Sequence, residues 1–83
     1  MMNKEDIFRL VVEHTREVLP ELEEYNIQPN DRLVDLGANS VDRAEIIMRT
    51  MESLSLKVPR VELFGAKNIE ELVELLYEKI QSV

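Results

Sequence analysis

The sequence predicts an all-α fold: a bundle of three longer helices and one short helix, with a long loop between the first two. Three observations support this class. Apolar residues recur at helical spacing in three separate stretches. Only two glycines and three prolines interrupt 83 residues. The 45% share of hydrophobic residues is typical of a compact domain and not of a linker. At this length, residues 1–83 make one domain with a modest core.

The first predicted helix begins after Asn3 and ends near Leu19. Asparagine is a residue type that caps helices, and Pro20 disfavours helical geometry in the residue before it. The only histidine, His14, lies on the apolar stripe of this helix and has no partner at a catalytic spacing. We therefore expect His14 to be a structural or surface residue. The stripe consists of Ile7, Leu10, Val11 and Val18.

A long connection, residues 20–39, separates the first two predicted helices. Loops of more than about a dozen residues are uncommon in compact domains and tend to be functional or internally packed. Its glutamates lack the pattern of a calcium loop, which favours a solvated acidic edge over a metal site. Five apolar residues are expected to hold the connection against the bundle: Leu22, Ile27, Leu33, Val34 and Leu36.

The second predicted helix runs from Ser40 to about Leu54 and is apolar on two sides. One side suits the core and contains Ile46, Ile47 and Leu54. The other stripe is displaced around the helix and consists of Val41, Ala44, Met48 and Met51. Full burial of both is not expected in so small a bundle, so the second stripe predicts a docking surface, with a charged surround of Asp42, Glu45 and Glu52. The alternative is that both stripes belong to the core.

Two further elements complete the chain. Residues 60–64 follow Val58-Pro59 and are too short to form a stable helix alone. The run Asn68-Ile69-Glu70-Glu71 has the shape of a capping box, with asparagine in place of serine or threonine. Beyond it, an apolar stripe predicts a closing amphipathic helix and consists of Ile69, Leu72, Val73, Leu76 and Ile80.

The composition narrows the classes of function. Asp plus Glu number 17 against 10 Lys plus Arg, and the net charge of −7 disfavours binding to nucleic acid and anionic membranes while favouring partners with basic patches. The chain has no cysteine, so a thiol would have to come from a cofactor, and this fits a reducing cytoplasm. No apolar run approaches a membrane span, and the N-terminus lacks a signal-peptide core. We expect a cytoplasmic monomer without membrane insertion.

Ser40 is the candidate reactive residue, because it follows a glycine-containing turn at the point where a helical pattern begins. A hydroxyl at a helix N-terminus is well placed to carry a phosphate. Catalysis by the chain itself is poorly supported, since a hydrolase nucleophile elbow needs glycines where Ala38 and Asp42 stand. There is also no second histidine, no phosphate-cradling glycine loop and no zinc-ligand spacing. We expect a protein that is not an enzyme.

The pattern Leu33-x-Asp35-Leu36-Gly37-x-x-Ser40, followed by Val58-Pro59 and a closing amphipathic helix, resembles that of acyl carrier proteins. The resemblance covers essentially the whole chain. It implies an acyl-carrier-like four-helix bundle in which 4'-phosphopantetheine is attached covalently to Ser40 and carries acyl groups as thioesters. Viewed locally, Ser40 fits an ordinary helix cap equally well.

The resemblance also implies roles for the residues around Ser40. Asp35 and Asp42 would help a phosphopantetheinyl transferase engage, around a magnesium ion held on the transferase side. Arg43 and Arg49 depart from the strongly acidic recognition helix of typical fatty-acid carriers. Together with the docking stripe, the implied partner-binding residues are Asp35, Leu36, Val41, Asp42, Arg43, Ala44, Glu45, Met48 and Met51.

Asn39 before the serine and Arg43 after it make this segment similar to the free-standing donor carriers of polyketide β-branching. In that subfamily the carrier receives malonyl from an acyltransferase, and a decarboxylating ketosynthase-like enzyme leaves acetyl on the arm. A 3-hydroxy-3-methylglutaryl (HMG) synthase-like enzyme then takes the acetyl group. Two alternatives stay open: a general fatty-acid or polyketide carrier, and an unmodified helical adaptor that uses Met48 and Met51 to hold a complex together.

Overall fold

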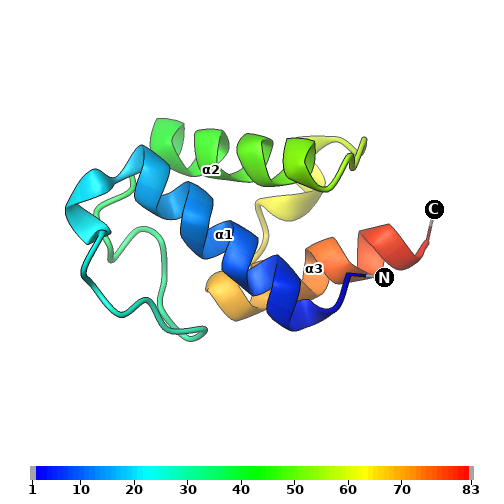
Figure 1. Ribbon diagram of the computed structural model, residues 1–83. Coiled ribbons are helices and arrows are strands. Elements are labelled where there is room, and N and C mark those ends of the chain that lie inside the picture. Colours follow the sequence, from blue (N-terminus) through cyan, green and yellow to red (C-terminus); the bar gives the residue numbers. More distant parts are fainter. Residues whose placement is uncertain (1, 83) are drawn as a thin grey trace.

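The computed structural model describes residues 2–82, and within that range it contains helices and no strand. Three α-helices form the frame: α1 (Lys4–Val18), α2 (Ser40–Ser53) and α3 (Ile69–Gln81) (Figure 1). Two short 3-10 turns lie between them, η1 (Pro20–Leu22) and η2 (Arg60–Leu63). The predicted all-α class is confirmed, and η1 is an addition to the predicted elements. None of the helices described has the length and apolar character of a membrane span.

An asparagine opens each of the three α-helices. Its side-chain oxygen accepts a hydrogen bond from the backbone N–H three residues later, at 2.8 Å in each case: Asn3 from Asp6, Asn39 from Asp42 and Asn68 from Glu71. At α1 and α2 the aspartate accepts from the N–H of the asparagine in return, which completes two capping boxes. The box predicted at α3 is only half formed, since Glu71 Oε1 accepts from the N–H of Lys67 at 3.0 Å instead.

The helix α1 packs against both other long helices and runs in the opposite direction to them (Figure 1). Over residues 2–82, α2 and α3 share no close backbone contact, and η2 lies against both. The space between α2 and α3 is therefore bridged by η2 and not by direct helix packing. The fully buried members of the core include Ile7, Val11, Ile46, Leu63, Ile69 and Leu76.

The long connection is attached to the start of α3 by backbone hydrogen bonds. The N–H of Ile69 donates to the carbonyl of Asp31 at 2.9 Å, and the N–H of Glu70 donates to that of Pro29 at 2.8 Å. These donors lie in the first turn of α3, where no intrahelical acceptor exists for them. The carbonyls of the connection therefore satisfy the start of α3.

The apolar anchors of this connection are as predicted except at one position. Leu22, Ile27 and Leu33 are buried and Leu36 is half-buried. Val34 is 48% exposed, so the expectation is wrong for this residue. The reason is that residues 32–37 coil in a helical turn, and only one side of that turn faces the core.

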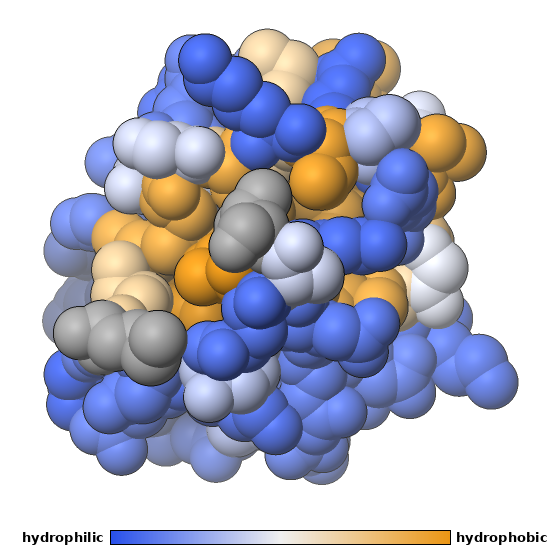
Figure 2. Space-filling view, turned by 90° about the vertical axis from the view of Figure 1, so that its right-hand side faces the viewer, coloured by the Kyte–Doolittle hydropathy of each residue, from blue (hydrophilic) through white to orange (hydrophobic). Residues whose placement is uncertain are grey.

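The end of the molecule opposite Ser40 shows how incompletely so small a bundle covers its core. Figure 2 views this end, where apolar atoms (orange) remain visible between hydrophilic side chains (blue). Such partial cover is expected, since a short chain has too little polar surface to enclose its apolar residues.

Candidate functional site

Ser40 is the first residue of α2 and is exposed to solvent. The cap position belongs to Asn39, whose side chain closes the box with Asp42. The local alternative for Ser40, an ordinary helix cap, is therefore wrong, because the asparagine performs that role. Within residues 2–82 no side chain or backbone group is hydrogen-bonded to the Ser40 hydroxyl, which leaves it open to chemistry.

The turn that precedes Ser40 is tightly wound. The N–H groups of Leu36 and Ala38 both donate to the carbonyl of Leu33, each at 3.1 Å. Gly37 has a φ of 102°, a conformation that L side chains rarely adopt, and this explains the glycine at that position. Ala38 is 2% exposed and anchors the end of the turn in the core.

Asp42 and Arg43 both brace this turn from within α2. The Asp42 carboxylate accepts from the N–H of Asn39 at 3.1 Å, and Arg43 Nη1 donates to the carbonyl of Ala38 at 2.7 Å. The sequence predicts both residues as partner contacts, and that stays a prediction; the structure adds an internal role for each. Asp35 is exposed on the outside of the turn, with an oxygen 3.9 Å from the Nε of Arg32.

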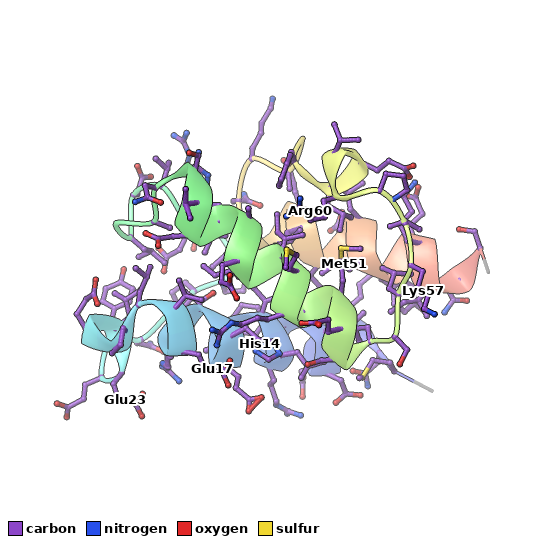
Figure 3. The ribbon with its side chains drawn as sticks, turned by 90° about the horizontal axis from the view of Figure 1, so that it is seen from above. His14, Glu17, Glu23, Met51, Lys57 and Arg60 are labelled. Atoms are coloured by element: carbon purple, nitrogen blue, oxygen red, sulfur yellow. The ribbon has the colours of Figure 1, made fainter. Side chains whose placement is uncertain are left out.

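The predicted docking stripe on α2 is exposed only in part. Val41 is 74% exposed and Met48 39%, whereas Ala44 is half-buried. Met51 is 8% exposed and belongs to the core, so its assignment to an exposed docking surface is wrong. Each residue advances a helix by about 100°, so Met51 lies about 80° around the helix from Val41, toward Ile47. In Figure 3 it lies on the side of α2 that faces α3 and η2.

A surface that the sequence analysis missed lies beside Met48 on η2. Arg60 Nη1 is 2.9 Å from the Met48 sulfur, and Figure 3 shows Arg60 between α2 and η2. Leu63 is buried, but Val61 and Phe64 are 73% and 52% exposed. We name Arg60, Val61 and Phe64 the η2 surface. The available signal was a segment with three large apolar residues that is too short to bury them all.

An ion pair fixes η2 to α3. Lys79 Nζ lies 2.7 Å from Glu62 Oε1, and this hydrogen bond raises the pKa of Lys79 above its ordinary value. Glu62 is thus held toward α3 and Leu63 is held in the core. With these two residues engaged, Val61 and Phe64 are left on the outside of the turn.

A groove of about 780 Å³ opens between α2, the long connection and the segment that joins η2 to α3. Its wall includes the buried side chains of Ile47, Leu63 and Leu72. Ser40 lies on the same side of α2 as the groove, because a separation of seven residues leaves Ser40 and Ile47 only about 20° apart around the helix. Arg43, less than one turn from Ser40, is part of the lining. Charged and amide side chains also line it: Asn30, Arg32, Arg43, Lys67, Asn68 and Glu71.

A second polar cluster lies between α1 and the last turn of α2. His14 Nδ1 is 2.8 Å from Glu17 Oε1, and His14 Nε2 is 2.7 Å from Ser53 Oγ, an arrangement of carboxylate, base and hydroxyl (Figure 3). At the end of a helix the free backbone groups are carbonyls, so donors for an oxyanion are lacking. The neighbouring N–H groups of Leu54 and Ser55 are already bonded within the chain. We interpret the cluster as a brace between helices, which agrees with the structural role predicted for His14.

Arg49 extends this brace along α2. Its Nη1 lies 3.1 Å from Glu17, and its Nε lies 2.8 Å from Glu45. Hydrogen bonds from His14 and then Arg49 lower the pKa of Glu17 below its ordinary value. The hydrogen bonds that Arg49 donates to Glu45 and then to Glu17 raise the pKa of Arg49. The negative charge of Glu45 is therefore paired with Arg49 on the same helix.

The start of α2 has the properties that a covalently attached phosphate requires. An exposed hydroxyl without a hydrogen-bond partner in the described chain stands in the first turn, where the helix dipole favours negative charge. Within residues 2–82, no group of three or more His, Cys, Asp or Glu side chains is placed to hold a metal ion. The site therefore suits an anionic group on Ser40.

The phosphopantetheine attachment site family matches residues 9–76 of this sequence. The chain belongs to this family and is an acyl carrier protein, a class whose members carry 4'-phosphopantetheine covalently. This confirms the predicted family and cofactor.

Its relatives make the class more specific. The polyketide biosynthesis acyl-carrier-protein AcpK of Bacillus subtilis (strain 168) is 57% identical over 98% of this chain and 99% of its own. The acyl carrier protein of Cyanidium caldarium is 28% identical over 99% of this chain and 95% of its own. A chain in the crystal structure of the curacin biosynthetic pathway HMG synthase in complex with acetyl donor-ACP has a TM-score of 0.88 and 53% identity, covering 90% of this chain and 96% of that one. The predicted similarity to polyketide donor carriers is thereby confirmed.

Proposed function

We propose that this chain is an acetyl donor carrier in polyketide β-branching, with 4'-phosphopantetheine attached at Ser40. The observation that supports it most is the similarity, at 53% identity and a TM-score of 0.88, to a chain in the complex of an HMG synthase with acetyl donor-ACP. The exposed Ser40 hydroxyl at the start of α2 supports the attachment point. When attached, the group supplies a thiol that holds acyl groups as thioesters.

The chain's own residues position the attachment point. Asn39 and Asp42 fix the first turn of α2, and Arg43 holds the preceding turn against it through the Ala38 carbonyl. The N-terminal N–H groups of α2 favour the charge of a phosphodiester on Ser40. Because a tethered acyl group has a high effective concentration at each partner, weak and transient docking is sufficient.

We propose that partners dock on the exposed face around Ser40, where single apolar side chains stand among charged ones. The successive partners would be a phosphopantetheinyl transferase, an acyltransferase, a decarboxylating ketosynthase-like enzyme and an HMG synthase-like enzyme, all in the cytoplasm. The chain would act as a monomer and catalyse no reaction itself. The proposed contacts are Asp35, Leu36, Val41, Asp42, Arg43, Ala44, Glu45 and Met48, together with the η2 surface.

Intact mass after co-expression with a promiscuous phosphopantetheinyl transferase tests the attachment. The wild type is expected to gain one arm and Ser40→Ala none. Ser53→Ala is the matched control, because it removes a hydroxyl from the other end of the same helix and should be modified like the wild type. A wild type that stays unmodified beside a modified control carrier would contradict the proposal and favour the helical adaptor.

Acetyl transfer to an HMG synthase-like enzyme tests the β-branching role. The chain, loaded with acetyl, is compared with a fatty-acid carrier loaded in the same way. We expect transfer from this chain at a higher kcat/KM. Equal transfer from both would favour the general carrier alternative, and no transfer from this chain would contradict the donor role.

A further inference from the structure

The groove beside Ser40 has a charge balance opposite to that of the whole chain. Three cationic side chains line it, those of Arg32, Arg43 and Lys67, against the single carboxylate of Glu71. The chain as a whole carries a net charge of −7. A partly enclosed site lined by one sign of charge focuses its field and attracts ions of the other sign.

These cations are not neutralised by the chain itself. Among residues 2–82, neither Arg43 nor Lys67 belongs to an ion pair, and Arg32 has only the 3.9 Å contact with Asp35 at the exposed turn. Glu71 accepts from the backbone N–H of Lys67 at 3.0 Å and has no side-chain cation as partner in that range. Positive charge is therefore available to a ligand in the groove.

The wall of the groove strengthens this effect. Val34 and Phe64 line it and are 48% and 52% exposed, so they contribute apolar surface. The other large apolar residues of the lining, among them Ile47, Leu63 and Leu72, are buried. A volume of about 780 Å³ falls within the range of ordinary small-molecule sites, which combine apolar walls with a few placed polar groups. Next to low-polarity walls, hydrogen bonds between a cation and a carboxylate are stronger than in water.

We propose that this groove binds the free carboxylate of a dicarboxylic acyl group, such as malonyl, carried on Ser40. This inference rests on the proposed function, because the arm brings the acyl group to the groove. Ser40 and the groove lie on the same side of α2, and Arg43 is three residues after Ser40, which is less than one helical turn. Arg32, Arg43 and Lys67 hold the carboxylate, while the apolar wall accepts the methylene carbon.

The groove thereby distinguishes a malonyl from an acetyl cargo. A partner enzyme that removes the carboxylate as CO₂, with a proton taking its place on the α-carbon, also removes the group that the three cations hold. The acetyl thioester that results has no charge to bind there. Arg32, Arg43 and Lys67 then release it, and the acetyl group becomes accessible to the next partner.

Chemical shifts of backbone amides test this inference. The chain is loaded from malonyl-CoA or acetyl-CoA by a phosphopantetheinyl transferase, and intact mass verifies each product. We expect the amides of Arg43 and of residues 66–68 to shift in the malonyl form relative to the acetyl form. Lys67→Gln and Arg32→Gln should move these malonyl signals back toward their acetyl positions, and Lys57→Gln, a cation outside the groove, should leave them unchanged.

The outcomes separate the two proposals. If no arm is gained, the proposed function fails. If the arm is gained but both acyl forms shift the same groove amides, the groove binds acyl groups without selecting a carboxylate, and the inference is overturned. It is overturned equally if the malonyl form leaves the groove amides unshifted, or if the Lys67 and Arg32 variants keep the malonyl signals of the wild type.

Discussion

Asn39 separates the reactive residue from the structural one at the start of α2. Its side chain caps the helix, so Ser40 is free to be modified. Asn39→Ala is expected to lower the free energy of unfolding by about 1 kcal/mol, because the N–H of Asp42 loses its acceptor. Urea denaturation measures this loss. Asn39→Asp retains a capping oxygen and is the control; an equal loss in both variants would show that the cap is not the cause.

Gly37 sets the direction in which the chain enters α2. Its φ of 102° is strained for any residue with a side chain. A methyl group at this position would nevertheless meet no other heavy atom within 4 Å. Gly37→Ala is therefore expected to lower the free energy of unfolding by about 1–3 kcal/mol through the backbone alone. Gly65 also has open space but no positive φ, so Gly65→Ala should leave stability almost unchanged. Thermal unfolding of both variants makes the comparison, and similar losses would contradict it.

The brace between α1 and α2 predicts a dependence of stability on pH. Glu17 has a pKa below its ordinary 4.5 because His14 and Arg49 hydrogen-bond its carboxylate. Between the lowered value and 4.5, the unfolded chain binds more protons than the native one, so stability rises with pH there. The contribution is present above this window and is lost as the pH falls through the folded pKa.

Glu17→Gln removes this contribution and should flatten the dependence of unfolding free energy on pH in that window. Denaturant titrations at a series of pH values from neutral to the range where carboxylates titrate measure the free energy of unfolding at each pH. Glu13→Gln is the control, because Glu13 is an exposed glutamate on the same helix with no ion pair in the described residues. An unchanged slope in the Glu17 variant would contradict the brace.

The η2 surface predicts an effect on docking in addition to an effect on stability. Phe64 is 52% exposed, so about half of its ring is covered within the chain, and Phe64→Ser should lower the free energy of unfolding by about 1–2 kcal/mol. If a partner covers the ring, its loss costs about 1–2 kcal/mol of docking free energy, a rise of about five- to thirtyfold in the KM for acetyl transfer. Tyr25→Ser is the control, since Tyr25 is 44% exposed and lies outside α2 and η2. Equal changes in KM would refute a role for η2.

For the molecule as a whole, local patterns in the sequence predict most of the frame. Asparagine caps, proline stops and helical periodicity are properties of neighbouring residues, so the three long helices follow from them. The position of Ser40 before an apolar helical pattern is equally local. Met51 was misplaced because a stripe at spacings of three and four spreads around a helix, and the packing of α1 and η2 against α2 decides which side of it is covered.

Features made by distant segments could not be predicted in this way. The groove combines residues of α2, the long connection and the start of α3. The internal bond from Arg43 to Ala38 depends on the fold of the turn before the helix. Neither leaves a pattern in neighbouring residues, which is why Arg43 was predicted only as a partner contact.

The two backbone hydrogen bonds from Ile69 and Glu70 to the long connection tie distant parts of the chain into one cooperative unit. If the connection detaches, both donors lose their acceptors at the same moment. Native-state deuterium uptake at these two amides should therefore report the opening of the connection, with nearly equal protection at both positions. Deuterium uptake in the first turn of α3 thus measures how often the connection that leads to Ser40 opens.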